Sequence, residues 1–263
     1  MAAKKGVQAA LVVHQLGTGY PGNRHALVDI SFTIEAGQRV AVIGPNGAGK
    51  STLIKAIVGL LQFSSGSISV CGEDCYSSHS LVGYVPQQND IDWSFPASVY
   101  DVVMMGRSRH IGWFRLPRRA DHQAVRDILE HLSLGHLAKR QISELSGGQR
   151  RRVFIARALA QDSRVLLLDE PFTGVDQHAE GEISEALDIM TRQGITILMA
   201  THHIENAAQR FDKILVLRQG ETVAFGAPDD ILDPQLLRQA FGASISVVGK
   251  DLLMLSRKPE GPA

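Results

Sequence analysis

The stretch "GPNGAGKST", Gly44–Thr52, decides the fold. It places three glycines around one lysine, between the apolar run Val40–Ile43 and apolar residues that recur at helical spacing from Leu53. Glycine costs backbone entropy, so such a cluster requires a reason. A strand, a loop fitting G-x-x-x-x-G-K-[ST] and a helix are the arrangement of a phosphate-binding loop. We therefore expect nucleotide to bind to Gly44, Pro45, Asn46, Gly47, Ala48, Gly49, Lys50, Ser51 and Thr52.

Within this loop, each residue type has a physical reason. The glycines let backbone N–H groups curl around phosphate oxygens without an obstructing Cβ, and the following helix adds the positive end of its dipole. Lys50 can reach the β- and γ-phosphates, and the Ser51 hydroxyl can ligate Mg²⁺. The motif thus predicts a phosphate-bearing ligand with Mg²⁺ beside it.

Two further apolar runs, Val165–Leu168 and Ile195–Ala200, match the run before the loop. Short, wholly apolar runs suit strands buried on both faces of a parallel sheet, and helical patterns lie between them. Strands that alternate with helices predict an α/β fold with a mostly parallel sheet. The N-terminal segment Ala9–Ile34 has a turn-rich break and predicts two or three antiparallel strands.

Polar residues follow each buried run. Asp169 and Glu170 follow the second run, and Thr201 and His202 follow the third. Since ligands bind outside the carboxyl ends of parallel strands, these residues should converge on the phosphate loop. Asp169 is then placed to hold Mg²⁺, and Glu170 to act as general base on the attacking water.

A second candidate anion site lies in "LSGGQRRR". A serine and two glycines open a helix that continues through "VFIARALAQ", so Ser146 is either an ordinary N-cap or a hydroxyl donor at an anion-binding helix end. The residues of this candidate site are Leu145, Ser146, Gly147, Gly148 and Gln149.

The combination of "GPNGAGKST", "LSGGQ" and "LLLDEP" resembles the nucleotide-binding subunits of ATP-binding cassette transporters, over about residues 10–225. The resemblance implies a P-loop NTPase core with an N-terminal antiparallel β subdomain and a helical subdomain that carries the LSGGQ signature. It also implies an ATP hydrolase that works as a head-to-tail dimer. Each ATP would lie between the phosphate loop of one subunit and the signature helix of the other.

The resemblance assigns roles to further residues. Tyr20 resembles the aromatic residue that stacks on adenine, and Asp176 the aspartate that communicates across the dimer. Gln87 resembles the glutamine that senses Mg²⁺ and the attacking water, with Gln88 as an alternative. His202 resembles the switch histidine that contacts the γ-phosphate. The expected catalytic set is Glu170, His202 and Gln87, and the expected Mg²⁺ ligands are Ser51, Gln87 and Asp169.

Two departures from the family pattern stand beside these roles. "FTGVD" replaces the commoner "SALD", and "THH" replaces the commoner "THD". Both keep the key residues, Asp176 and His202. The second departure leaves open what orients His202, and His203 is not assumed to replace it.

The segment Asp90–Pro117 resembles the corresponding segment of bacterial ATPases that power manganese, zinc or iron(II) uptake. The resemblance implies a metal cargo, an integral membrane permease that this segment faces, and an extracytoplasmic metal-binding protein reached through the permease. A siderophore, haem or cobalamin cargo is the alternative. The large apolar residues of the segment either fill a small satellite core or form a protein-binding patch: Trp93, Phe95, Trp113 and Phe114.

Two other groups have open interpretations. The basic residues Arg107, Arg109, Arg115, Arg118 and Arg119 either face permease loops or lipid headgroups, or form a solvated face. Cys71 and Cys75, with His79 nearby, are either part of a metal site or two reduced thiols. Two thiols and one histidine fall short of the usual four-ligand zinc pattern, which favours thiols.

Charge and hydropathy argue against other classes of protein. The chain has 263 residues, with Lys+Arg and Asp+Glu equal at 27 each, which argues against a nucleic-acid binder. A soluble cassette protein acting on DNA or ribosomes is therefore the less favoured alternative. No apolar run approaches the ~18 residues of a membrane span. The two lysines near Met1 are not followed by an apolar segment, so we expect no signal peptide. We expect an ATPase domain over residues 7–231, with its helical subdomain at roughly 90–160, and a short appendage and disordered tail over 232–263. The expected location is the cytoplasmic face of the inner membrane, as a peripheral subunit.

Overall fold

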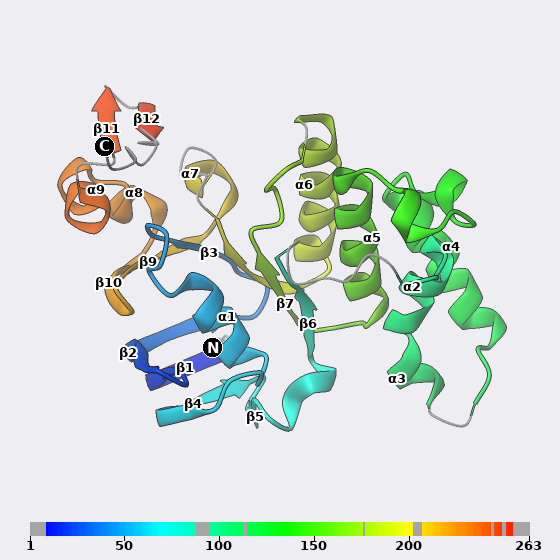
Figure 1. Cartoon of the computed structure of the whole chain (residues 1–263), viewed down its shortest axis with the longest axis horizontal. Coiled ribbons are helices and arrows are strands. Elements are labelled where there is room, and N and C mark those ends of the chain that lie inside the picture. The colour runs from blue at the N-terminus through cyan, green and yellow to red at the C-terminus, as the bar shows by residue number, and fades with distance from the viewer. Residues whose placement is uncertain are drawn as a thin grey trace, which may run out of the picture.

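The computed structural model describes residues 9–87, 95–112, 115–175, 177–201, 207–242, 245–248 and 251–254. Two sheets and the helices packed on them form one body, and a group of helices lies at one end of it (Figure 1). The N-terminal strands, drawn in blue, lie toward the opposite end.

The central sheet has six strands in the order β10-β9-β3-β8-β7-β6. Three of its four inner strands, β3, β8 and β7, are buried at every residue, as the three apolar runs predict. Strands β9, β3, β8, β7 and β6 are mutually parallel, and β10 is antiparallel at the edge. The bounds are β3 Arg39–Ile43, β6 Val82–Val85, β7 Val165–Asp169, β8 Thr196–Ala200, β9 Lys213–Arg218 and β10 Glu221–Gly226.

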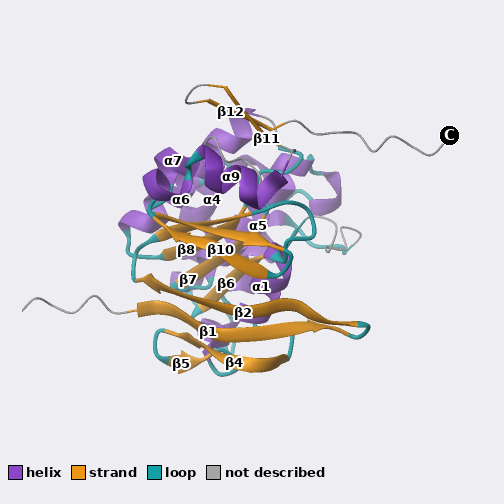
Figure 2. Cartoon of the chain, turned by 90° about the vertical axis from the view of Figure 1, so that its left-hand side faces the viewer, coloured by secondary structure: helices purple, strands orange, loops and turns teal. Residues whose placement is uncertain are grey.

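A second, antiparallel sheet has the order β2-β1-β4-β5. Strand β1 (Ala9–Tyr20) pairs with β2 (Asn23–Glu35) and β4 (Phe63–Val70), and β4 pairs with β5 (Glu73–Asp74). The predicted antiparallel strands over Ala9–Ile34 are therefore confirmed as two. Figure 2 shows this sheet below the central one, as a separate layer.

Helix α1 (Lys50–Ile57) fills the space between the two sheets. Its apolar side chains, among them Leu53 and Ile57, share one core with residues of β1, β2 and the near face of the central sheet. The far face packs against α5 (Gly147–Ala160) and α6 (Gln177–Arg192), which share a second core with it. The phosphate loop thus connects a fully buried strand to a helix held on two sides.

The helical end of the molecule holds α2 (Val99–Gly106), α3 (Ser108–Ile111) and α4 (Arg119–His131) (Figure 1). Short 3₁₀ segments, η3 (Gly135–Leu137) and η4 (Ile142–Glu144), lead from it to α5, and η1 (Ser78–Ser80) precedes β6. The predicted fold class is confirmed: an α/β core with a mostly parallel sheet, an antiparallel N-terminal sheet and a helical part that carries the signature.

The C-terminal part differs from the sequence prediction in one respect. The pattern over residues 228–242 predicts one helix, whereas the structure has α8 (Pro228–Ile231) and α9 (Pro234–Phe241). Asp233 caps α9 by accepting hydrogen bonds from the backbone of Gln235 and Leu236, and Pro234 lacks the N–H that a continuous helix requires. Helix α7 (Ala207–Arg210) precedes β9, and a hairpin of β11 (Ile245–Val248) and β12 (Asp251–Met254) follows α9. Among helices of the described ranges, none has the length and apolar character needed to cross a bilayer.

Candidate functional site

The phosphate loop needs its glycines at two positions for steric reasons. Gly44 has φ +156° and a Cβ there would lie 2.2 Å from the carbonyl oxygen of Leu217. Gly49 has φ +103° and a Cβ there would lie 2.6 Å from Leu27 Cδ2. At both positions a side chain would meet both a left-handed backbone and a neighbouring atom, so the loop keeps its shape only with glycine.

Lys50 points back into the loop that precedes it. Its Nζ donates hydrogen bonds to the carbonyl oxygens of Gly44 at 2.8 Å and Pro45 at 3.1 Å. The residue is 6 % exposed, and burial lowers the pKa of its amine, while the carboxylates of Glu170 and Asp169 raise it. A cation held by two carbonyls at the entrance of a helix is suited to an anion with strong oxygen acceptors.

Ser51 and Asp169 meet across the end of the central sheet. Ser51 Oγ donates a hydrogen bond of 3.0 Å to Asp169 Oδ1, and Asp169 is fully buried as the last residue of β7. The two residues are 118 positions apart in the sequence, so the sheet topology brings them together. This meeting is the convergence expected from the polar residues at the strand ends.

Glu170 lies directly after β7 in an unusual backbone conformation. Its φ is +50°, and its N–H donates to the carbonyl oxygen of Ala200 at 3.0 Å. Its Oε2 accepts hydrogen bonds from Gln87 Nε2 at 3.4 Å and from Thr173 Oγ1 at 3.2 Å. The left-handed conformation of a non-glycine residue costs about 1–3 kcal/mol and is typical of functional sites.

These groups face a common cavity of about 650 Å³. It is lined by Asn46–Thr52 of the loop and by Gln87, Glu170 and Tyr20, the last at the end of β1 and 38 % exposed. The cavity is large enough for a nucleotide and has a polar floor. Three lining residues were not predicted from the sequence: His25, Ala26 and Gln219. They lie in or near turns that carry no periodic signal.

The signature residues lie apart from this cavity. Ser146 is the N-cap of α5, and its Oγ accepts a hydrogen bond of 3.3 Å from the Gln149 backbone, while Gln149 Oε1 accepts one of 3.0 Å from the Ser146 backbone. None of the residues 145–149 is among those that line the cavity. Within one chain, the structure therefore brings the loop, Asp169, Glu170 and Gln87 together and leaves the signature outside.

Three of the predicted positions fall outside the described residues. They are Asp176, His202 and the alternative glutamine, Gln88. Thr201, which precedes His202, donates its backbone N–H to Val42 at 3.1 Å and is buried. The chain thus leaves β8 beside β3, at the same edge as the phosphate loop.

The comparisons with known proteins agree with this geometry. The family model described as "ABC transporter" matches residues 27–173. The chain belongs to the ABC transporter family. It is 41% identical over 232 residues to the manganese transport system ATP-binding protein MntB of Bacillus subtilis, covering 88% of this chain and 92% of that protein. It is 42% identical to the zinc transport system ATP-binding protein TroB of Treponema pallidum, covering 84% and 82%.

A solved structure supports the same assignment. CbiO1 of Clostridium perfringens, part of the ABC transporter complex CbiONQ, is 32% identical, with a TM-score of 0.75 and coverage of 88% of this chain and 94% of that one. The predicted membership in this family and the predicted ATP hydrolase class are therefore confirmed. The roles of individual residues remain predictions that the geometry above makes specific.

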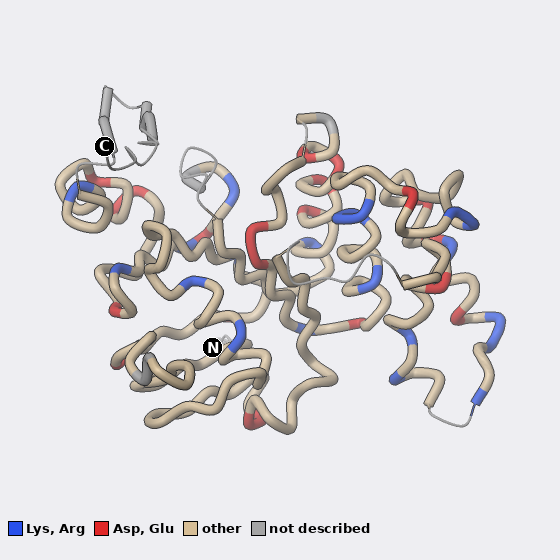
Figure 3. Tube along the Cα trace, viewed as in Figure 1, with Lys and Arg blue, Asp and Glu red and all other residues tan. Residues whose placement is uncertain are grey.

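The basic residues do not behave as one group. Figure 3 shows basic positions along α3 and the start of α4. Arg109, Arg115, Arg118 and Arg119 are exposed, whereas the Arg107 guanidinium bonds to Asp121 at 3.1 Å and Asp162 at 2.8 Å. Arg107 therefore links the end of α2 to α4 and to the turn that follows α5.

The structure describes the aromatic residues of the segment Asp90–Pro117 only in part, and it describes both cysteines. Phe95 is 52% exposed, whereas Trp93, Trp113 and Phe114 fall outside the described residues. Cys71 and Cys75 are free thiols, and burial raises the pKa of Cys75 to about 11. In the described part of the chain, no three His, Cys, Asp or Glu side chains are grouped as a metal site would require.

Proposed function

We propose that the chain is the ATP-hydrolysing subunit of a bacterial importer for divalent metal ions, namely manganese, zinc or iron. The observation that carries the proposal is the meeting of the phosphate loop, Glu170 and Gln87 around one cavity, with Asp169 hydrogen-bonded to Ser51 of the loop. The relatives named above support the cargo, since their names refer to manganese and zinc transport. A third relative, YfeB of Yersinia pestis, is named for chelated iron transport and is 41% identical over 90% of this chain.

In the proposed reaction the loop binds the triphosphate of ATP. Backbone N–H groups of the loop and the start of α1 surround the phosphate oxygens, and Lys50 Nζ exchanges its two carbonyl acceptors for the β- and γ-phosphates. Tyr20, at the mouth of the cavity, is suited to stack on the adenine ring. Binding thus uses groups that already face one another in the free chain.

Glu170 is the proposed general base. Its carboxylate lies at the cavity wall and is held by Thr173 and Gln87, which fixes its direction. From this position it can accept a proton from a water that attacks the γ-phosphate. Gln87 would orient the same water, and His202, which follows β8 in the sequence, would contact the γ-phosphate.

The residues of the site also fit Mg²⁺. Ser51, Gln87 and Asp169 offer hydroxyl, amide and carboxylate oxygens, which are the ligands that this hard cation takes. The hydroxyl of Ser51 and the carboxylate of Asp169 are already 3.0 Å apart. Bound there, Mg²⁺ would neutralise phosphate charge.

A second copy of the chain is the proposed partner at the open side of the cavity. In the proposed head-to-tail dimer, Ser146 and the glycines that follow it contact the ATP bound by the other subunit, and Asp176 communicates across the interface. The separation of the signature from the cavity within one chain supports this arrangement, because the signature needs another nucleotide to contact. ATP binding would close the dimer, and hydrolysis would open it.

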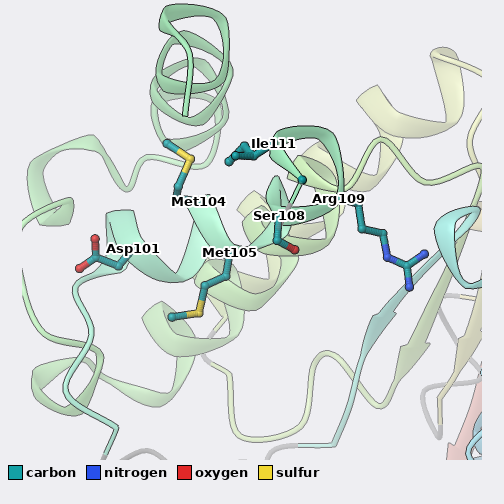
Figure 4. Close-up of a pocket in the computed structure, with 7 residues that line it drawn as sticks. Asp101, Met104, Met105, Ser108, Arg109 and Ile111 are labelled. Carbon is teal, nitrogen blue, oxygen red and sulfur yellow. The ribbon is translucent and has the colours of Figure 1, made fainter. Parts of the chain in front are cut away.

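The proposed docking surface for the permease is a hollow of about 590 Å³ on α2 and α3. Figure 4 shows Met104, Met105 and Ile111 around it, with Asp101 on one side and Arg109 on the other. Flexible methionine side chains adapt to the apolar face of a partner helix, and charges at the rim select its orientation. Docking here would hold the subunit at the cytoplasmic face of the membrane, and the extracytoplasmic metal-binding protein would act through the permease.

The catalytic proposal is tested with Glu170→Gln. We expect its rate of ATP hydrolysis to fall about 10²–10⁴-fold while ATP still binds, because the carboxamide cannot accept the proton. Glu221→Gln, which removes an exposed carboxylate from β10, is the matched control and should hydrolyse ATP like the wild type. Hydrolysis by Glu170→Gln at the wild-type rate would refute the role of Glu170.

The cargo is tested in cells. Total manganese, zinc and iron are measured by mass spectrometry in cells that carry Glu170→Gln and in wild-type cells, both in metal-limited medium. A selective fall in one metal is expected and names the cargo. No change in any of the three would overturn the metal assignment and favour a siderophore, haem or cobalamin, and leave the ATPase proposal standing.

A further inference from the structure

Arg151 is a buried arginine on the helix that carries the signature. It is the second of three consecutive arginines, and only 3% of its surface is exposed. Its neighbours have other partners. Arg150 donates to the carbonyl oxygens of Ile142 and Ser143, and Arg152 forms an ion pair with Glu182.

The guanidinium of Arg151 binds three backbone carbonyls. Its Nε donates to Pro171 at 3.0 Å, its Nη1 donates to Pro86 at 2.9 Å, and its Nη2 donates to Glu170. Pro86 directly precedes Gln87, and Glu170 and Pro171 directly follow β7. One planar fork therefore holds both segments that carry the proposed base and the glutamine beside it.

Three features make this contact more than a structural bond. The two segments leave adjacent parallel strands, β6 and β7, whose own ladder ends at Val85 and Leu168. Glu170 has the left-handed φ of +50°, which persists only where the surroundings fix it. Burial lowers the pKa of the Arg151 guanidinium, whereas the carboxylates of Asp169 and Glu170 raise it.

We propose that Arg151 is a positioning residue that fixes the carboxylate of Glu170 and the amide of Gln87 relative to the signature helix. The proposal rests on the proposed function, in which Glu170 is the base. Ser146 lies five residues earlier on α5, or about 7.5 Å along the helix axis. A displacement of α5 by the other subunit's nucleotide would therefore move the carbonyls of Glu170 and Pro86 together. In the proposed dimer, the signature helix of one chain contacts the ATP that the other chain binds. Arg151 would therefore connect that contact to the base in the ATP site of its own chain.

The first test compares Arg151→Met with Arg157→Met. Arg157 lies on the same helix, is also largely buried, and its guanidinium lies 5.8 Å from the centre of the Phe154 ring, so its loss controls for removing a buried arginine from α5. We expect Arg151→Met to lower kcat about 10–100-fold, since an error near 1 Å in a reacting geometry can cost 10²-fold. Its Kd for ATP, measured with a fluorescent ATP analogue, should change less than about 3-fold, because the phosphate loop is untouched.

The control should keep a kcat close to that of the wild type even where it lowers the melting temperature by a similar amount. Equal falls of kcat in the two variants would overturn the proposal, because the effect would then follow from lost stability. Wild-type kcat in Arg151→Met would also overturn it. Should Arg151→Met fail to fold, Arg151→Lys keeps the charge but not the three-way fork, and it should still lower kcat with an unchanged Kd; an unchanged kcat in Arg151→Lys would count against the proposal.

A double variant shows whether Arg151 acts through Glu170. In Glu170→Gln protein the base is already lost, so adding Arg151→Met should lower the residual hydrolysis by a smaller factor than it lowers wild-type hydrolysis, through Gln87 alone. A further fall as large as the one seen with Glu170 present would overturn the proposal. Failure of the proposed function gives a different result, since Glu170→Gln alone would then hydrolyse ATP like the wild type.

Discussion

The first turns of α1 and α5 begin in opposite ways. Helix α1 begins after Gly49, which is in the left-handed region and gives no side-chain hydrogen bond to the first turn. Helix α5 begins after Ser146, whose side chain and that of Gln149 form a complete capping box. Glycines lie just before α1 and in the first turn of α5, yet only one of the two ends is capped by its own side chains.

This difference distinguishes a helix end that can bind phosphate within one chain from a helix end that contributes only when a second subunit is present. The first N–H groups of a helix have no partners within the helix, so the uncapped end of α1 leaves donors for phosphate. At α5, the N–H of Gln149 is already used by Ser146. We therefore infer that α1 provides ATP affinity in the single chain, and that α5 contributes when the other subunit's nucleotide competes for its cap.

Among the variants that test this comparison, replacing Gly49 with alanine should have the largest effect. We expect Gly49→Ala to destabilise the fold by about 2–5 kcal/mol, from the left-handed backbone and from overpacking against Leu27. Gly47→Ala is the matched control, since Gly47 also has positive φ but a Cβ there meets nothing within 4 Å. It should cost about 1–2 kcal/mol. Urea unfolding measures both, and equal costs would contradict the packing explanation.

Removing the lysine of α1 should come next. We expect Lys50→Ala to weaken ATP binding by about 1.5–3 kcal/mol, since it deletes a charged hydrogen bond to phosphate. Titration with a fluorescent ATP analogue measures the loss. Lys213→Ala removes a lysine that lies over the Phe225 ring on the edge of the sheet and serves as the control. Wild-type ATP affinity in Lys50→Ala would show that α1 holds its ligand in some other way.

The cap of α5 should give the smallest change in stability and a selective change in activity. Ser146→Ala and Ser98→Ala each remove a serine from a complete capping box, at α5 and at α2, and each should cost about 1 kcal/mol of stability. Only Ser146→Ala should also lower the rate of ATP hydrolysis, about 10-fold or more, because it deletes the proposed hydrogen bond to the charged phosphate of the other subunit's ATP. Equal rates in the two variants would mean that Ser146 is an N-cap and no more.

The sequence predicts the α1 end well because its signals are local. An apolar run, three glycines and a lysine lie within thirteen consecutive residues, Val40–Thr52, and each has a direct physical meaning. Asp169 and Glu170 were predicted in the same way, as polar residues at the end of a buried run. The split of the C-terminal helix could also be predicted, since Asp233 and Pro234 are a helix-start signal.

Other parts depend on tertiary contacts that no local pattern shows. The sequence does not distinguish the three consecutive arginines from one another. Only the rotation of α5 relative to the segments after β6 and β7 determines that Arg151 is the one that binds Pro86 and Glu170. His25, near the start of β2, and Gln219, in the turn after β9, line the cavity, and a hydrogen bond from the Val28 backbone to the carbonyl oxygen of Gly220 holds these two segments together. Arg107 was grouped with exposed basic residues, yet its partners Asp121 and Asp162 lie on distant segments.

The most direct measurement is the molecular mass of Glu170→Gln protein by analytical ultracentrifugation, with and without ATP. We predict a monomer without ATP and a dimer with ATP, since slow hydrolysis preserves the bound nucleotide. Adding Lys50→Ala should abolish the dimer by preventing ATP binding, and adding Ser146→Arg should abolish it while ATP still binds. A dimer that persists with Ser146→Arg, or a Glu170→Gln chain that binds ATP and stays monomeric, would contradict the assignment of ATP binding to α1 and of the contact with the other subunit's ATP to α5.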